Sequence, residues 1–133
     1  MIKALRVVMI VWAIIMILYG LAFIFVPEQL GAMSGFEKGP AYVAYLGALL
    51  GVSWIVPAVF VIIAARDPLR NIMWVKFVTV LQVLALAADV YSLLRGFIDL
   101  SQGGMGLILD AVLAVLLLVF YPWRVKPRSA SSP

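Results

Sequence analysis

The chain alternates between long apolar stretches and short polar segments. Two of the apolar stretches, residues 7–26 and 41–65, contain no charged residue. A helix needs roughly 20 predominantly apolar residues to cross the hydrocarbon core of a bilayer. These two stretches are therefore predicted to be membrane-spanning helices.

Two further stretches, residues 72–94 and 103–121, are long enough to span a membrane but contain charged residues. Their ends support the same assignment. Asp67 followed by Pro68 is typical of an N-cap with proline at the first helical position, so the third helix is predicted to begin there. Pro122 disfavours helical geometry in the residue before it, so the fourth helix is predicted to end there. The fold class predicted is an all-α integral membrane protein, a four-transmembrane-helix antiparallel bundle.

The connecting segments are short and define a single domain. Residues 1–123 are predicted to form the transmembrane domain, and residues 124–133 a basic, Ser- and Pro-rich tail that is disordered. Residues 27–35 begin with proline and are too polar for the bilayer interior, so they are predicted to form a short interfacial helix. Consecutive spans joined by such short connections are expected to be antiparallel neighbours.

Lysine and arginine predict the orientation, because basic residues in short loops resist translocation. Most of the basic residues fall in segments that share one side of the membrane, and only Lys38 and Arg95 fall in the loops on the opposite side. Both termini are therefore predicted to be cytoplasmic, in a plasma membrane. A cleavable signal peptide is disfavoured because the first apolar run is too long and lacks a small-x-small cleavage site. The basic residues on the cytoplasmic side are Lys3, Arg6, Arg66, Arg70, Arg124, Lys126 and Arg128.

Composition supports the membrane assignment and narrows the chemistry. Hydrophobic residues make up 66% of the 133 residues and charged residues 12%, whereas a soluble domain carries about 25% charged residues. The chain has no cysteine and no histidine. Disulfides, thiolate zinc sites, histidine-ligated metals and imidazole-based catalytic triads are thereby excluded. We expect no catalytic residue, metal site or cofactor.

A few polar residues lie within the predicted spans. Counting about 1.5 Å per residue from the cytoplasmic ends places most of them near mid-membrane. Buried acids almost always face the bundle interior or a water-filled cavity. We therefore expect an intramembrane polar layer formed by Tyr19, Ser53, Gln82, Asp89 and Asp110.

The two aspartates of this layer are expected to interact. Side chains lean toward the N-terminus of their own helix, so carboxyl groups on antiparallel helices can approach each other in height. We expect Asp110 to be protonated and to donate a hydrogen bond to a partner such as Gln82. The layer then serves either as a proton relay or polar ligand contact, or as interhelical hydrogen bonds that fix helix rotation.

The second span carries features of close packing. Residues 47–51 form a Gly-x-x-x-Gly motif, which favours packing against another helix of the same chain over a dimer interface. Pro57 is expected to kink the helix, and such a kink either opens a binding cavity or only bends the helix. Trp54, at mid-depth, either lines an apolar pocket or packs in the core.

Residues near the predicted cytoplasmic face are assigned to membrane contacts. Trp74 and Trp123 are typical of boundary anchors. The basic residues Arg124, Lys126 and Arg128 are expected to contact anionic lipid headgroups as well as to set the topology.

Three short motifs carry a family resemblance. With residues 66–71 (Arg-Asp-Pro-Leu-Arg-Asn), residues 121–124 (Tyr-Pro-Trp-Arg) and the Pro27-Glu28 step, the chain resembles the BphX-like family of small multi-pass membrane proteins over nearly its full length. The resemblance implies four helices and transfers no catalytic residue. The DoxX-like group of four-helix membrane proteins is the nearest alternative likeness.

These features predict a small membrane accessory or scaffold protein, not an enzyme, that can bind an apolar small molecule or lipid within the bundle. Its expected partners are the lipid bilayer and a homo-oligomer or larger membrane complex, with no nucleic acid. The alternative is an oligomeric transporter or proton-coupled protein that uses Asp89 and Asp110. A membrane enzyme with these carboxylates as acid and base ranks third, because no metal-ligand spacing, phosphate loop or activated nucleophile accompanies them.

Overall fold

The computed structural model describes residues 2–124, and every regular element in that part of the chain is an α-helix. Four of the helices are long and apolar enough to cross a membrane, which confirms the predicted fold class, and the short helix predicted after the first span is also present. Lys126 and Arg128 lie outside the described residues. The elements are α1 (Ile2–Phe25), α2 (Pro27–Met33), α3 (Ala41–Ala64), α4 (Ile72–Leu94) and α5 (Leu100–Phe120).

Local sequence explains where α5 begins and ends. The Asp99 carboxylate accepts the backbone N–H of Gln102 at 2.9 Å, and the Gln102 side chain accepts the backbone N–H of Asp99 at 3.2 Å. This capping box starts the helix at Leu100, earlier than the predicted residue 103. At the other end Tyr121 has extended backbone angles (φ −60°, ψ 135°), as the proline after it requires.

The third span occupies the predicted residues 72–94, but the helix start predicted at Asp67 is wrong. Helix α4 begins at Ile72, and its N-cap residue is Asn71, which makes no side-chain capping hydrogen bond. Asp67 instead closes a separate turn: its carboxylate accepts the backbone N–H of Arg70 at 3.3 Å, and its carbonyl accepts the Asn71 side chain at 2.9 Å. The Asp-Pro step therefore belongs to the connection between α3 and α4.

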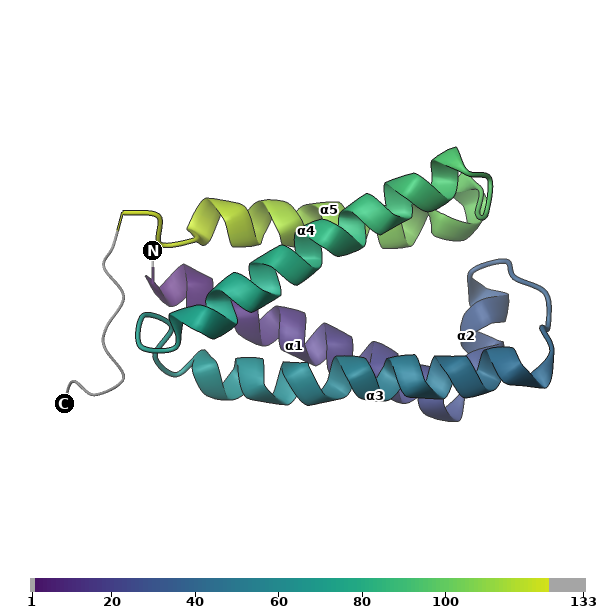
Figure 1. Cartoon of the computed structure of the whole chain (residues 1–133), viewed down its shortest axis with the longest axis horizontal. Coiled ribbons are helices and arrows are strands. Elements are labelled where there is room, and N and C mark those ends of the chain that lie inside the picture. Colours follow the sequence, from purple (N-terminus) through teal and green to yellow (C-terminus); the bar gives the residue numbers. More distant parts are fainter. Residues whose placement is uncertain (1, 125–133) are drawn as a thin grey trace.

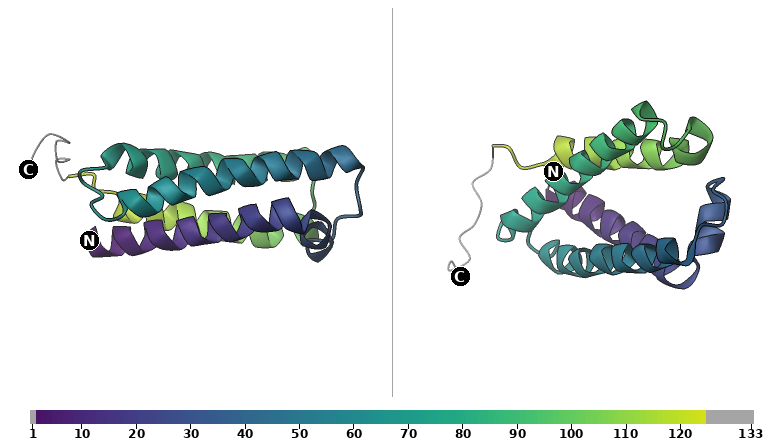
Figure 2. Two further views of the ribbon diagram at one scale, coloured as in Figure 1. Left: turned by 90° about the horizontal axis from the view of Figure 1, so that it is seen from below. Right: turned by 45° about the vertical axis from the view of Figure 1, so that its right-hand side comes forward.

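The spanning helices form two hairpins that diverge (Figure 1). Helix α1 packs along α3, and α4 packs along α5; we call these pairs the first and second hairpin. The hairpins lie close together at the end where α1 begins and α5 ends, which we call the terminal end. They separate toward the opposite, distal end, where α2 lies (Figure 2).

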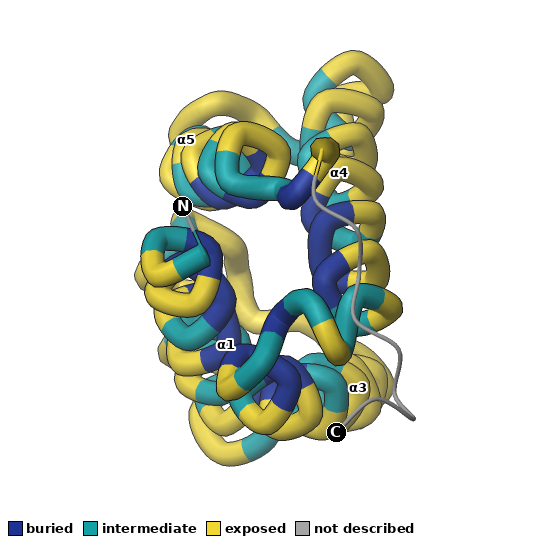
Figure 3. The backbone as a smooth tube through the Cα atoms, turned by 90° about the vertical axis from the view of Figure 1, so that its left-hand side faces the viewer, coloured by how far each residue is buried: buried dark blue, intermediate teal, exposed yellow. Residues whose placement is uncertain are grey.

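The packed core lies in the terminal half of the bundle. Its side chains come from all four spanning helices, and the buried faces of the tubes point toward one another (Figure 3). The largest fully buried side chains include Trp12, Leu5, Met9, Leu117, Gln82, Val61, Val75 and Val78. The distal half contributes few residues to this core, so space remains between the hairpins there.

Glycines bring the two helices of the first hairpin into close contact. A Cβ added at Gly51 would overlap the carbonyl oxygen of Gly20, and one added at Gly20 would lie 2.7 Å from the carbonyl oxygen of Gly51. The second glycine of the Gly-x-x-x-Gly motif thus packs against another helix of the same chain, as predicted. Helix α3 continues through Pro57 without interruption.

The outward faces of the helices are apolar. Leu18, Leu84 and Ile108 are 61%, 61% and 67% exposed. Water would solvate such a surface poorly, whereas lipid tails match it. Four apolar helices with such outward faces are those of a multi-pass membrane protein.

Candidate functional site

A hydrogen-bonded chain of three side chains joins the two hairpins. The indole N–H of Trp12 in α1 donates to Gln82 Oε1 in α4 at 2.7 Å. The Gln82 side-chain amide donates in turn to Asp110 in α5, at 2.7 Å to Oδ1 and 3.2 Å to the backbone carbonyl. Trp12 and Gln82 are only 1% and 2% exposed. Hydrogen bonds between these three side chains pair the Trp12 indole N–H and both ends of the Gln82 amide, so the network fixes the rotation of three helices.

The orientation of the Gln82 amide follows from its neighbours. An indole N–H can only donate, so the Gln82 carbonyl oxygen must face Trp12 and its NH₂ group must face Asp110. The predicted contact between Asp110 and Gln82 is present, but the predicted direction is wrong. Asp110 accepts the hydrogen bond because the Gln82 carbonyl oxygen faces Trp12, which was not predicted to belong to the polar layer, and the NH₂ group faces Asp110.

Asp89 lies two turns distal to Gln82 on the same helix and faces α5. Its carboxyl group is close enough to that of Asp110 for a hydrogen bond and for electrostatic interaction. Its Oδ2 atom is buried and has no hydrogen-bond partner in the described part of the chain. The expected approach of the two carboxyl groups is therefore present, and it leaves one buried oxygen unsatisfied.

A cavity of about 430 Å³ lies between the hairpins. Of the predicted site residues, it brings together Tyr19, Trp54, Gln82, Asp89 and Asp110. All five helices contribute to its lining. The other lining residues are Trp12, Met16, Phe23, Leu30, Met33, Ser34, Pro57, Leu81, Ala85, Ser101, Gln102, Met105, Gly106 and Leu109.

Aromatic side chains of the first hairpin form one wall of this cavity. The Trp54 ring lies edge-on to Phe23, with ring centres 5.2 Å apart, and to Tyr19 at 6.5 Å. Trp12, Tyr19 and Phe23 recur at helical spacing on α1 and so share one face. That spacing is visible in the sequence and was the signal that could have revealed the wall. The interpretation of Trp54 as a pocket residue agrees with its position.

Ser53 does not belong to the polar layer. It is exposed, and its hydroxyl donates to the Leu50 carbonyl of its own helix at 2.7 Å. Its estimated depth was compatible with the layer, but the rotation of α3 turns it outward. A hydroxyl bonded to its own backbone can face lipid at little cost, so its polarity alone did not place it inside.

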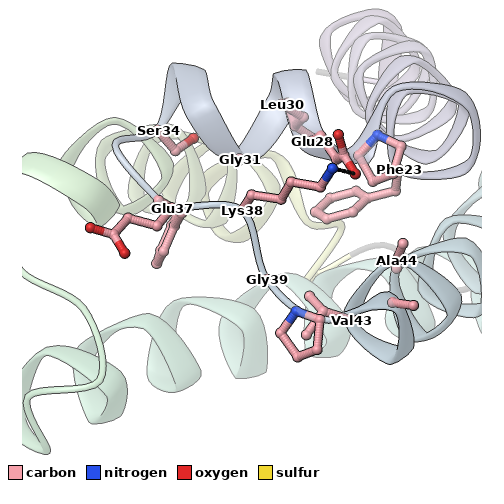
Figure 4. Close-up of a pocket in the computed structure, with 15 residues that line it drawn as sticks. Phe23, Glu28, Leu30, Gly31, Ser34, Glu37, Lys38, Gly39, Val43 and Ala44 are labelled. Atoms are coloured by element: carbon pink, nitrogen blue, oxygen red, sulfur yellow. Dashed lines mark ion pairs between the residues drawn. The ribbon is translucent and has the colours of Figure 1, made fainter.

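A second pocket, of about 530 Å³, lies at the distal end between α2 and the start of α3 (Figure 4). Glu28 and Lys38 form an ion pair of 3.4 Å across it. Phe23, Leu30 and Ser34 line both this pocket and the cavity between the hairpins. The two spaces therefore adjoin.

The described residues assigned to the membrane boundary, Trp74, Trp123 and Arg124, lie at the terminal end. Trp74 stacks on Phe60 with ring centres 5.3 Å apart, Trp123 is 67% exposed, and Arg124 is exposed. These positions are compatible with the predicted boundary contacts. Among residues 2–124, no group of acidic side chains is arranged to hold a metal ion.

In comparisons with known proteins, no family model, no curated protein and no solved structure matches the chain. The resemblance to the BphX-like family, and the alternative DoxX-like likeness, therefore stay predictions.

Proposed function

We propose that this multi-pass membrane protein binds an apolar or amphiphilic small molecule in the cavity between its hairpins, and that it is a binding or accessory protein rather than an enzyme. One observation carries the proposal. The cavity places an aromatic wall from the first hairpin opposite the polar side chains of α4 and α5. Mostly apolar linings with a few converging polar groups are typical of small-molecule sites.

The packing of the terminal half supports binding over passage through the protein. Trp12 and Gln82 lie where the cavity meets the core, and Met9 and Leu117 are fully buried beyond them. Side chains thus fill the space between the helices on the terminal side. A ligand would enter and leave from the distal side, beneath α2.

A purely structural scaffold is less well supported. A bundle that serves only to hold partners in place has no need of an internal space, whereas this cavity reaches both Asp89 and Asp110. The BphX-like resemblance is part of the proposal and is supported only by the short motifs at helix ends. It specifies no ligand.

The second candidate is a proton-coupled or transport function. The observation that favours it is the close approach of the Asp89 and Asp110 carboxyl groups inside the span. Such pairs mark proton relays in membrane proteins. This candidate requires a second conformation in which the terminal half opens, and an oligomer to complete the path.

The location proposed is a plasma membrane with both termini in the cytoplasm. Exposed basic residues gather at the terminal end, at the start of α1, in the connection from α3 to α4 and after α5; they are Lys3, Arg6, Arg66, Arg70 and Arg124. Their excess over Lys38 and Arg95 supports this orientation.

Native mass spectrometry of the protein released from lipid nanodiscs tests the proposal. We expect retained small molecules on the parent protein and their loss in Gly106→Leu, because Gly106 lines the cavity and a side chain there enters open space. Gly104→Leu is the matched control: it lies on the same helix, also borders open space, and does not line the cavity. Equal retention by both variants contradicts the proposal.

A further inference from the structure

The charges that line the cavity are of one sign. Asp89 and Asp110 are its ionisable acids, and the described lining contains no lysine or arginine. Lys76, the one basic residue within α4, lies exposed near its terminal end, and Lys38 pairs with Glu28 in the distal pocket. The described residues thus offer no internal cation to the two carboxyl groups.

Hydrogen bonds among residues 2–124 do not satisfy both carboxyl groups. The Asp110 carboxylate accepts one hydrogen bond from Gln82, while Asp89 Oδ2 is buried and has no partner among the residues that the structure describes. Two carboxylates so close together repel each other, and no cation of the described chain offsets that repulsion. A negative charge in such a buried position is costly unless it is paired.

The rest of the lining indicates what kind of cation fits. A metal ion such as Ca²⁺ needs six to eight oxygen ligands and Mg²⁺ an octahedral shell, whereas the wall opposite the acids consists of Tyr19, Phe23 and Trp54. Aromatic faces attract organic cations and also accommodate apolar groups. The site therefore suits a molecule with an ammonium group at one end and an apolar body.

We infer that the ligand of this cavity is a lipophilic amine, whose protonated nitrogen binds at Asp89 and Asp110 and whose apolar body packs against Trp54 and Tyr19. The inference rests on the proposed function and adds the chemical class of the ligand. Asp110 has two roles in it: it accepts from Gln82 and it contacts the amine. Asp89 contributes only to the contact with the amine.

Two probes of nearly equal size and shape test whether binding requires a positive charge on the ligand. 4-Phenylbutylamine is a cation at neutral pH, and 4-phenylbutanol replaces its ammonium group with a hydroxyl. Binding is measured by equilibrium dialysis against the full chain in phosphatidylcholine nanodiscs, with empty nanodiscs subtracted for partitioning into lipid. We expect the amine to bind at least about tenfold more tightly than the alcohol, a difference of about 1.4 kcal/mol.

Substitutions then locate the interaction. Asp89→Asn removes the charge with little change in volume and should reduce amine binding to the level of the alcohol. Asp110→Asn keeps an oxygen that can accept from Gln82 and should have the same effect. Asp99→Asn is the control: it removes a carboxylate at the same end of the bundle, outside the cavity, and asparagine can still cap α5. It should leave amine binding unchanged.

The outcomes separate the inference from the function on which it rests. Alcohol binding that persists in Asp89→Asn shows that the variant is folded. Equal binding of amine and alcohol to the parent protein, or tight amine binding that survives in both cavity variants, overturns the inference and leaves the proposed function standing. Absence of binding of either probe above empty nanodiscs contradicts both.

Discussion

Gln82 connects three of the spanning helices through one side chain. Its amide has two ends with opposite hydrogen-bonding capacity, and each end meets a partner of the matching kind, Trp12 and Asp110. The sequence indicated that Gln82 lies inside the bundle, because an amide in the middle of a span is costly when it faces lipid. It did not indicate Trp12, since an indole in a span can face lipid or the bundle interior, and only the rotation of α1 decides between the two.

Replacing Gln82 tests the importance of this connection. Gln82→Leu leaves the buried Trp12 N–H without an acceptor and removes the donor to Asp110. We expect the free energy of unfolding to fall by about 1–2 kcal/mol, measured by titration with sodium dodecyl sulfate in mixed micelles. Gln29→Leu, on the exposed surface of α2, is the control and should change it little. An unchanged value in Gln82→Leu would show that the network is not structural.

The contact between α1 and α3 depends on the absence of side chains at two positions. Gly51→Ala places a methyl group against the Gly20 carbonyl oxygen, so the helices must separate. We expect a loss of about 1–3 kcal/mol in the free energy of unfolding, as overpacking typically costs. The same sodium dodecyl sulfate titration measures it.

Gly47→Ala provides the matched comparison. Its added methyl group would lie 3.4 Å from the Phe23 ring, an ordinary contact. Alanine is also the better helix former, by up to about 1 kcal/mol. Gly47→Ala should therefore be neutral or slightly stabilising. Equal losses in the two variants would mean that the close approach of α1 and α3 is absent.

The start of α5 should respond to acid. Hydrogen bonds from the Ser101 hydroxyl and the Gln102 backbone N–H hold the pKa of Asp99 below its usual value of 3.8. Because the folded state has the lower pKa, the stabilisation by this cap is complete above about 3.8 and is lost as the pH falls through the lowered value. Hydrogen exchange of the Gln102 amide should therefore indicate opening of the first turn in that range, beyond the intrinsic pH dependence of exchange.

Asp99→Asn separates this effect from general acid unfolding. Asparagine can accept the same hydrogen bond but does not titrate in this range. We expect its first turn to stay protected at pH values that open the parent protein. Identical pH dependence in both proteins would show that Asp99 is not the titrating group.

Helix ends were predictable where one residue decides the backbone geometry. Pro122 ended the last span because its ring restricts the residue before it, and Pro27 started α2 for the same local reason. Asp67 misled because a capping residue and a turn residue have the same chemistry. Whether a helix follows such a residue immediately or after a further turn depends on how α3 and α4 pack, which the local sequence does not contain.

The arrangement of the hairpins was beyond sequence reasoning. The count of spans follows from hydropathy, and the polar layer follows from the cost of placing acids in lipid. The divergence of the hairpins depends instead on where large side chains fill the space between them, as Trp12, Met9 and Leu117 do at the terminal end. Ser53 was misplaced for the same reason: its depth could be counted along the chain, but the rotation of α3 could not.

The absence of native cysteine allows a direct test of the cavity and its entrance. We predict that a cysteine placed at Gly106, in the cavity, reacts with a charged methanethiosulfonate added on the distal side of the membrane, and that 4-phenylbutylamine slows the reaction. A cysteine placed at Ile108, on the outward face, should stay unreactive. An inert cysteine at position 106, or one that reacts only from the terminal side, would contradict a binding cavity that opens beneath α2.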